Sequence, residues 1–306
     1  MEMHNQYADA YRGYVGRVEK ALERLLPAEK ESFADGRIPS LLCEAMRYSL
    51  MAGGKRIRPV LLLAAADLFS VDPEEAEPMA AALEMIHTYS LIHDDLPGMD
   101  DDDLRRGRPT NHKVYGTGQA ILAGDGLLNY AYECMLNNAL LYPEHLKNHL
   151  EAISAIAGRA GVCGMIAGQC LDLESEHADP EPQRLTYIDR HKTADLLTAP
   201  LVAAARLGGA GEDTVKILEQ FGFAVGTAFQ IDDDLLDIEG DAQLLGKKTG
   251  VDDEKGKMTW PSMIGVAAAR EKSRALWKQA YDLLEGFGEK AWFLRELVRA
   301  LEVRKK

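Results

Sequence analysis

Apolar residues recur at spacings of three and four along almost the whole chain, which is the repeat of one face of an α-helix. Glycine and proline interrupt this pattern at intervals, and runs of alternating β-branched residues are absent. No fixed-period repeat, low-complexity tract or long linker divides the chain. The segments with the helical pattern are Leu41–Met51, Pro59–Phe69, Met79–Leu96, Gln119–Leu141, Leu150–Leu173, Thr186–Leu207, Val215–Ile238 and Met258–Leu284. The sequence therefore predicts an all-α fold in a single large domain over residues 1–306.

The composition argues against several classes of protein. The formal net charge of −14 argues against a nucleic-acid-binding surface and against a basic membrane-binding patch. No run of 18 or more apolar residues occurs and the first residues are polar, so we expect no membrane span and no signal peptide. The four cysteines lack the spacing of a zinc site, and we expect them to be reduced and buried in a cytoplasmic protein.

A first cluster of aspartates ends the helical segment Met79–Leu96. Asp94 and Asp95 fall in its last turn, where the helix dipole disfavours a carboxylate by roughly 0.3–1 kcal/mol. The Pro97-Gly98 turn returns the chain, so that Asp100 can approach Asp94. Such a local conflict indicates a functional site, and Asp100 is a further candidate metal ligand.

A second cluster lies far along the chain, inside another helical segment. Gln230, Asp233, Asp234 and Asp237 are spaced by three, four and seven, so they share one helical face. The surrounding residues are apolar, and buried carboxylates without a partner are very costly. Two acidic walls with arginines beside one of them suggest a diphosphate substrate carried on Mg²⁺.

Basic residues stand beside these clusters. Lys55 and Arg58 follow the flexible Gly53-Gly54 pair at the start of a helix, three residues apart and expected on one face. His87 precedes Asp94 by seven residues and shares its helical face. The remaining candidates for binding a diphosphate or lining the reaction site are Arg105, Arg106, Lys192, Thr193, Lys247 and Lys257.

These motifs together resemble the short-chain trans-prenyltransferases, the polyprenyl synthetase family, and among them the bacterial farnesyl diphosphate synthases. The resemblance is carried in family order by residues 53–59, 87–100, 104–107, 164–172, 192–193 and 229–237. It implies the isoprenoid synthase fold, a helical bundle around a central cavity. It also implies three Mg²⁺ ions per site, with Mn²⁺ able to substitute, and a homodimer.

The resemblance also implies a reaction and roles for single residues. Isopentenyl diphosphate would be condensed with dimethylallyl diphosphate and then with geranyl diphosphate. The metal ligands would be Asp94, Asp95, Asp100, Asp233, Asp234 and Asp237. The allylic diphosphate would be held by Arg105, Lys192 and Lys257, with Lys247 a further candidate. Isopentenyl diphosphate would be bound by Lys55, Arg58, His87 and Arg106. The reacting carbons would be lined by Thr193 and Gln230.

Product length depends on the depth of the cavity. Tyr89 and Ser90 precede Asp94 by five and four residues, about one helical turn. In the family an aromatic residue at the position of Tyr89, together with the inserted Pro97-Gly98 pair, is linked to a C15 product, farnesyl diphosphate. Two residues depart from the family pattern: Trp260 stands where Tyr or Phe is usual, and Asp232 precedes the second cluster as an additional aspartate.

Four alternatives remain. The enzyme could be a geranyl or geranylgeranyl diphosphate synthase with the same chemistry. His93-Asp94 also resembles the core of HD-type phosphohydrolases, although that family gives no reason for the second cluster. A non-catalytic prenyltransferase subunit would lack these aspartates. A terpene cyclase would lack the isopentenyl site.

Overall fold

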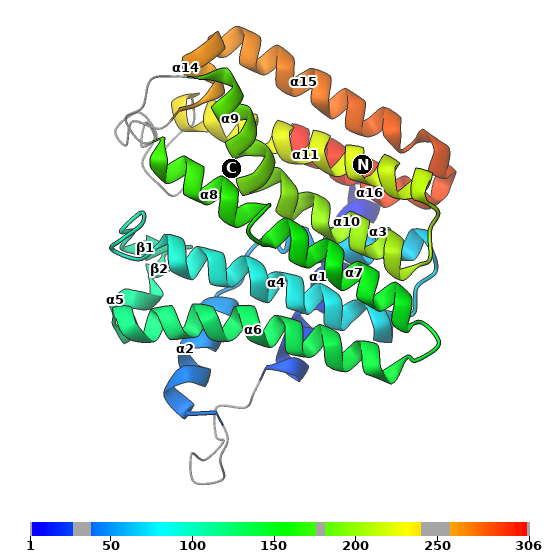
Figure 1. Cartoon of the computed structure of the whole chain (residues 1–306). Coiled ribbons are helices and arrows are strands. Elements are labelled where there is room, and N and C mark those ends of the chain that lie inside the picture. Colours follow the sequence, from blue (N-terminus) through cyan, green and yellow to red (C-terminus); the bar gives the residue numbers. More distant parts are fainter. Residues whose placement is uncertain (1, 27–37, 176–180, 240–257, 305–306) are drawn as a thin grey trace.

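The computed structural model describes residues 2–26, 38–175, 181–239 and 258–304, and it is helical almost throughout (Figure 1). This confirms the all-α fold. The elements of the first half are α1 (Glu2–Leu25), α2 (Ser40–Leu50), α3 (Ile57–Leu68), α4 (Pro73–Asp94), β1 (Leu104–Arg105), β2 (Arg108–Pro109), α5 (Asn111–Tyr115) and α6 (Thr117–Leu141). Those of the second half are α7 (Leu146–Ala160), α8 (Met165–Glu174), α9 (Pro182–Ile188), η2 (Asp189–Ala194), α10 (Asp195–Leu207), α11 (Glu212–Glu239), α14 (Trp260–Ile264), α15 (Val266–Leu283), η3 (Glu285–Ala291) and α16 (Trp292–Glu302).

Two segments expected to be single helices are each divided in two. The segment Leu150–Leu173 breaks between α7 and α8. There a Cβ on Gly164 would lie 2.1 Å from the carbonyl oxygen of Arg159, so only glycine fits. The segment Met258–Leu284 breaks at Gly265, which has a φ of 82°. Helices α1 and α16 were not among the predicted segments.

A two-stranded hairpin, which the pattern of apolar residues did not predict, carries the Arg105-Arg106 pair. Leu104 pairs with Pro109 and Arg105 with Arg108 in antiparallel register. The two turn residues, Arg106 and Gly107, both have positive φ, as the tightest hairpin turns require. The hairpin places these arginines beside the end of α4.

Two helices form the centre of the molecule. Helix α4 packs against α6, α3 and α1, and α10 packs against α7, α11 and α3 (Figure 1). In α10 every residue except Arg206 is buried, and α4 is buried without interruption over residues 78–86. Small alanine side chains in both helices allow this close packing. The buried ends of these helices can hold polar groups in a site that excludes water.

One segment, Leu146–Glu174, is long and apolar enough to cross a membrane by composition and length alone. The sequence had led us to expect no such segment. It consists of α7 and α8, with the glycine-rich break between them. Only a third of its most apolar window is buried inside the molecule. Because α7 packs against α10, we interpret this segment as part of the helical bundle.

All four cysteines are free. Cys43 and Cys134 are buried, whereas Cys163 and Cys170 are exposed. The expected burial is therefore wrong for the second pair, because Cys163 lies in the turn between α7 and α8 and Cys170 on an exposed side of α8.

Candidate active site

A cavity of about 580 Å³ lies between α4, α6, α8 and η2. One part of its wall is polar, and the rest is apolar and includes Leu128, Met165 and Leu196. The sequence-predicted residues that line it are Arg58, His87, Tyr89, Ser90, Asp94, Lys192 and Thr193. The fold thus brings candidates from three separate segments, α3, α4 and η2, to one cavity.

Asp94 and Asp100 are joined through the backbone. The amide of Asp100 donates a 2.8 Å hydrogen bond to the carbonyl oxygen of Asp94, which closes the loop between them. Burial raises the pKa of Asp94 to about 6; the nearby charge of Lys192 opposes this, and that of Asp100 adds to it. A half-buried carboxylate beside a second one is suited to a hard divalent cation.

Asp95, by contrast, is bound to the hairpin. Its buried carboxylate accepts a 2.9 Å hydrogen bond from Nε of Arg105, which also contacts Asp102 at 3.3 Å. Burial raises the pKa of Asp95, and the Arg105 hydrogen bond opposes that rise. The sequence predicts that Asp95 binds a metal ion and that Arg105 binds the allylic diphosphate. Both side chains would then have to contact those ligands in addition to each other.

A cationic pocket lies at one end of the cavity. Nη1 of Arg58 lies 3.2 Å from Nε2 of His87. Burial and the Arg58 charge hold the pKa of His87 well below its ordinary value, so the ring is neutral and Nε2 accepts. Nδ1 of His87 and Nε of Arg58 are buried without a hydrogen-bond partner. Two unsatisfied donors beside a cavity are what an anionic oxygen would satisfy.

The loop before α3 brings Arg106 to this pocket. Arg106 donates to the carbonyl oxygen of Gly53, and its guanidinium lies over Gly54, where a Cβ would come within 2.6 Å of Cζ. Lys55 is exposed and precedes the helix, which begins at Ile57. The expectation that Lys55 shares a helical face with Arg58 is therefore wrong, because Arg56 between them adopts a left-handed conformation with φ 52°.

Arg56 fixes this loop, a role that sequence reasoning missed. Its buried guanidinium bonds Glu19 and Glu84 at 2.7 Å each, and the carbonyl oxygen of Leu50 at 2.7 Å. It thereby ties α1, α4 and the end of α2 to the loop that precedes α3, the helix on which Arg58 lies. The sequence signal for this role was that Arg56 is a third basic residue within the Lys55–Arg58 motif.

The second cluster forms a chain of hydrogen bonds. Oγ1 of Thr193 donates to Oε1 of Gln230 at 2.9 Å, and Nε2 of Gln230 donates to Oδ1 of Asp234 at 2.9 Å. The other oxygen of Asp234 accepts from the amide of Trp260 at 3.1 Å. Asp237 is also buried, one turn further along α11. The chain links η2, α11 and α14 and fixes the amide oxygen of Gln230 beside Thr193.

Asp233 is the most exposed of the three aspartates predicted as ligands in this cluster, with 43% of its side chain accessible. Arg304, next to the end of α16, reaches back to it. Its Nη2 lies 2.7 Å from Oδ1 of Asp233 and 2.7 Å from the carbonyl oxygen of Phe229. A cation therefore already lies against this carboxylate.

The sequence matches the polyprenyl synthetase family over residues 39–293. The chain belongs to this family. It is 49% identical over 236 residues to farnesyl diphosphate synthase of Geobacillus stearothermophilus, covering 76% of this chain and 78% of the relative. It is 45% identical over 254 residues to geranylgeranyl pyrophosphate synthase 9 of Arabidopsis thaliana, covering 81% and 70%. The geranyltransferase of Helicobacter pylori, solved with magnesium and isoprenyl diphosphate, superposes with a TM-score of 0.79 at 31% identity, covering 95% of each chain.

This polyprenyl synthetase is thus a trans-prenyltransferase that elongates prenyl chains. The HD-type phosphohydrolase alternative is excluded by the family match. Within the described residues no three His, Cys, Asp or Glu side chains form a complete metal site on their own. Mg²⁺ is commonly held by one or two carboxylates together with substrate phosphates, and Asp94, Asp100 and Asp233 fit that use.

The synthetase has a π-helical turn, η2, that presents Lys192 and Thr193. Nζ of Lys192 lies 2.5 Å from Oδ2 of Asp172 on α8. A Cβ on Gly168 would lie 2.1 Å from the amide nitrogen of Lys192, so glycine is needed for α8 to approach. Asp172, which the sequence left without a role, positions the Lys192 ammonium, and Gln169 lines the cavity.

Trp260, the departure from the family pattern, has a specific partner. Its indole donates to Oδ2 of Asp189, the first residue of η2. Burial raises the pKa of Asp189 to about 7, although this hydrogen bond opposes the shift. The Trp260–Asp189 pair, which sequence reasoning missed, joins α14 to the turn that carries Lys192.

Lys247 and Lys257, predicted to bind the allylic diphosphate, lie outside the described residues.

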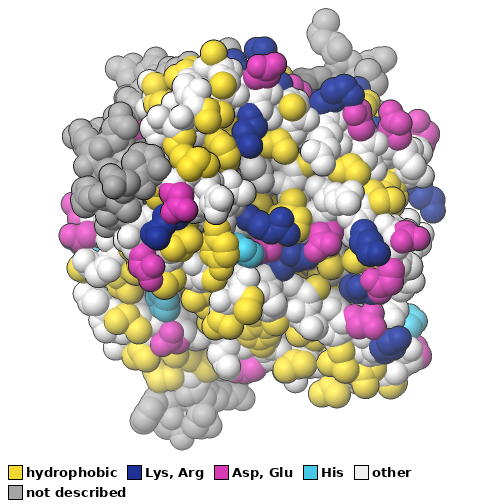
Figure 2. All heavy atoms as spheres, turned by 45° about the horizontal axis from the view of Figure 1, so that its top comes forward, with side chains coloured by type: hydrophobic (Ala, Val, Ile, Leu, Met, Phe, Trp, Pro, Cys, Tyr) yellow, Lys and Arg dark blue, Asp and Glu magenta, His cyan; other side chains and the backbone are white. Residues whose placement is uncertain are grey.

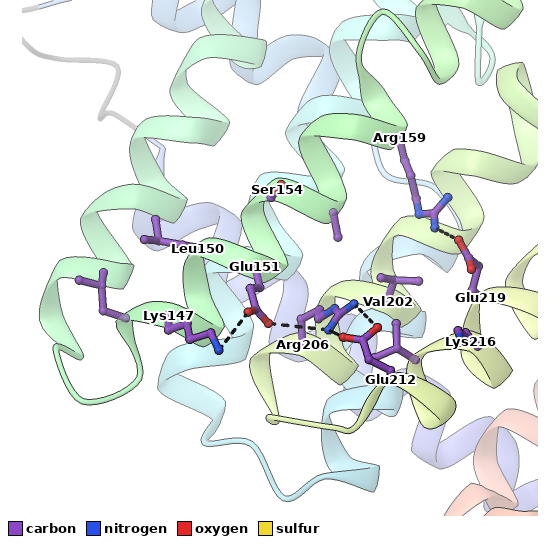
Figure 3. Close-up of a pocket in the computed structure, with 13 residues that line it drawn as sticks. Lys147, Leu150, Glu151, Ser154, Arg159, Val202, Arg206, Glu212, Lys216 and Glu219 are labelled. Carbon is purple, nitrogen blue, oxygen red and sulfur yellow. Dashed lines mark hydrogen bonds and ion pairs between the residues drawn. The ribbon is translucent and has the colours of Figure 1, made fainter.

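A larger groove of about 870 Å³ lies elsewhere in the synthetase, between α7, α10 and α11 (Figure 3). Most of its basic side chains are paired with its acidic ones. Arg206 lies 2.5 Å from Glu212 and 3.8 Å from Glu151, and Arg159 lies 2.5 Å from Glu219. These ion pairs compensate the charges of the groove, so size alone does not make it the functional site.

Proposed function

We propose that this polyprenyl synthetase is a farnesyl diphosphate synthase. It would condense isopentenyl diphosphate with dimethylallyl diphosphate and then with geranyl diphosphate, and release the C15 product. The observation that carries the product length is Tyr89. Its side chain lines the cavity and is only 6% exposed, next to Ser90 and five residues before Asp94. Burial raises its pKa to about 12, so it stays a neutral phenol.

The proposed chemistry begins with loss of the allylic diphosphate. Mg²⁺ held by Asp94, Asp100 and Asp233 would supply Lewis-acid stabilisation of that leaving group. Lys192, held by Asp172, would add a positive charge. Arg58, neutral His87 and Arg106 would hold the second diphosphate, the isopentenyl one, through the donors left unsatisfied in the cationic pocket.

The remaining wall would protect the allylic cation. Leu128, Met165 and Leu196 exclude water, which would otherwise quench the cation. The amide oxygen of Gln230, which accepts a hydrogen bond from the cavity residue Thr193, would help to stabilise the positive charge. The lost proton would pass to the departing diphosphate.

A C20 product is the second candidate, because the Arabidopsis relative at 45% identity is a geranylgeranyl pyrophosphate synthase. Tyr89 supports the C15 assignment, since its aromatic ring occupies space into which a longer chain would extend.

We also propose that the enzyme is a homodimer. Leu122, Leu136 and Leu140 of α6 are exposed by 53%, 45% and 71% and lie along one stripe of the helix. Hydrophobic surface is also widespread on the face drawn in Figure 2. Exposed apolar surface of this kind is typical of protein interfaces. A cytoplasmic location stays a prediction.

The test is product analysis of the pure protein with isopentenyl and dimethylallyl diphosphates, with and without Mg²⁺. We expect a Mg²⁺-dependent C15 diphosphate, and near-complete loss of turnover in Asp94→Ala with the fold retained by circular dichroism. A C10 or C20 product would overturn the chain-length assignment and keep the chemistry. Near-normal turnover of Asp94→Ala would overturn the assignment of the site.

A further inference from the structure

Tyr89 has one aromatic neighbour on its own helix. The ring of His93, one turn later on α4, meets the Tyr89 ring edge to face, with centroids 5.7 Å apart and an interplanar angle of 81°. Both side chains line the cavity. His93 immediately precedes Asp94, so the same residue touches the chain-length residue and adjoins a predicted metal ligand.

The His93 ring is also held by α6. Nε2 of His93 lies 3.1 Å from the carbonyl oxygen of Ile121, and because a carbonyl only accepts, Nε2 carries the hydrogen. Gly124 provides the space for the ring. A Cβ there would lie 2.2 Å from Nε2, 2.5 Å from Cδ2 and 2.9 Å from Cε1 of His93. One hydrogen bond and one missing side chain therefore fix the ring against α6.

The position of Tyr89 consequently depends on α6. We propose that His93 is a positioning residue for product length: it holds Tyr89 in place, and Gly124 and Ile121 hold His93. The inference rests on the proposed function, since it assigns a determinant of the C15 limit. It explains why a glycine stands in the buried interior of α6, where glycine weakens a helix.

The experiment compares product ratios in the full-length enzyme with Mg²⁺ at equal substrate conversion. Ratios are used because variants beside Asp94 can lower the rate without bearing on chain length. In His93→Ala the Tyr89 ring loses its support, and we expect the C20:C15 ratio to rise at least tenfold. His93→Gln can still donate to Ile121 but lacks the ring, and we expect the same direction of change.

Gly124→Ala tests the support without changing His93. The added methyl group displaces the His93 ring, and we expect the C15 share of the products to fall. Gly126→Ala is the matched control on the same helix, because the closest contact of its methyl group is Sδ of the flexible Met46 side chain at 3.1 Å, and its other contacts, at 3.8 and 3.9 Å, are ordinary van der Waals distances. We expect it to keep the wild-type ratio.

The outcomes separate this inference from the proposed function. Wild-type ratios in both His93 variants and in Gly124→Ala, with longer products from Tyr89→Ala, would overturn the role of His93 and keep the C15 assignment. A wild-type enzyme that makes no C15 product would overturn both.

Discussion

The indole nitrogen of Trp277 on α15 donates a 2.8 Å hydrogen bond to Oδ2 of Asp232 on α11. The other carboxylate oxygen accepts from Oγ of Ser273 at 2.5 Å. Asp232, the additional aspartate of the second cluster, is therefore directed to α15, whereas Gln230 and Asp234 bond with η2 and α14. Its role is to attach α11 to its neighbour.

Replacing the buried Trp277 with phenylalanine removes this donor. We expect Trp277→Phe to lower the free energy of unfolding by about 1–3 kcal/mol, because the carboxylate loses a partner and the core loses volume. Urea denaturation measures the change. The product ratio of the variant should stay that of the wild type; an altered ratio with unchanged stability would contradict a purely structural role.

Asp189 makes stability depend on pH. Its pKa is raised from 3.8 to about 7 by burial, so the folded protein holds a proton that the unfolded chain has already released. The contribution of Asp189 to the stability of the wild type should therefore fall as pH rises from about 4 to about 7. Asp189→Asn has no such carboxyl group and can still accept from Trp260. We expect its melting temperature, relative to the wild type, to be highest above pH 7 and to lose this advantage below pH 4. A pH-independent difference would show that the pKa is not raised.

Arg56 neutralises the buried Glu84, whose side chain is only 1% exposed. Arg56→Met should destabilise the protein by about 3–5 kcal/mol, because it leaves a buried charge unpaired. Chemical denaturation tests this. The control is Lys278→Met, which breaks the exposed Lys278–Asp282 pair and should cost less than about 1 kcal/mol. Equal effects of the two substitutions would speak against the structural role of Arg56. The Michaelis constant for isopentenyl diphosphate should also rise in Arg56→Met, since Arg56 holds the start of α3, where Arg58 lies.

Tyr89→Ala opens the cavity at the proposed limit of chain growth. We expect C20 products to exceed C15 products. The rate of the first condensation should change little, because Tyr89 is not among the residues predicted to bind the diphosphates. Chromatography of the dephosphorylated products measures this. Tyr89→Phe preserves the ring and serves as the control, with C15 still dominant. A C15 product from Tyr89→Ala would place the chain-length limit elsewhere.

The sequence by itself determined the all-α fold and the two acidic clusters, because helical periodicity and the spacing within one helix are local properties. It also placed Gln230 and Asp234 on one face, where their 2.9 Å hydrogen bond joins them. Packing between distant helices decided the rest. Which helices meet decides three contacts: Asp232 bonds Trp277, Asp172 holds Lys192, and Arg304 reaches Asp233. The breaks at Gly164 and Gly265 interrupt apolar patterns that continue through them, since backbone contacts and a positive φ, rather than hydrophobicity, end those helices.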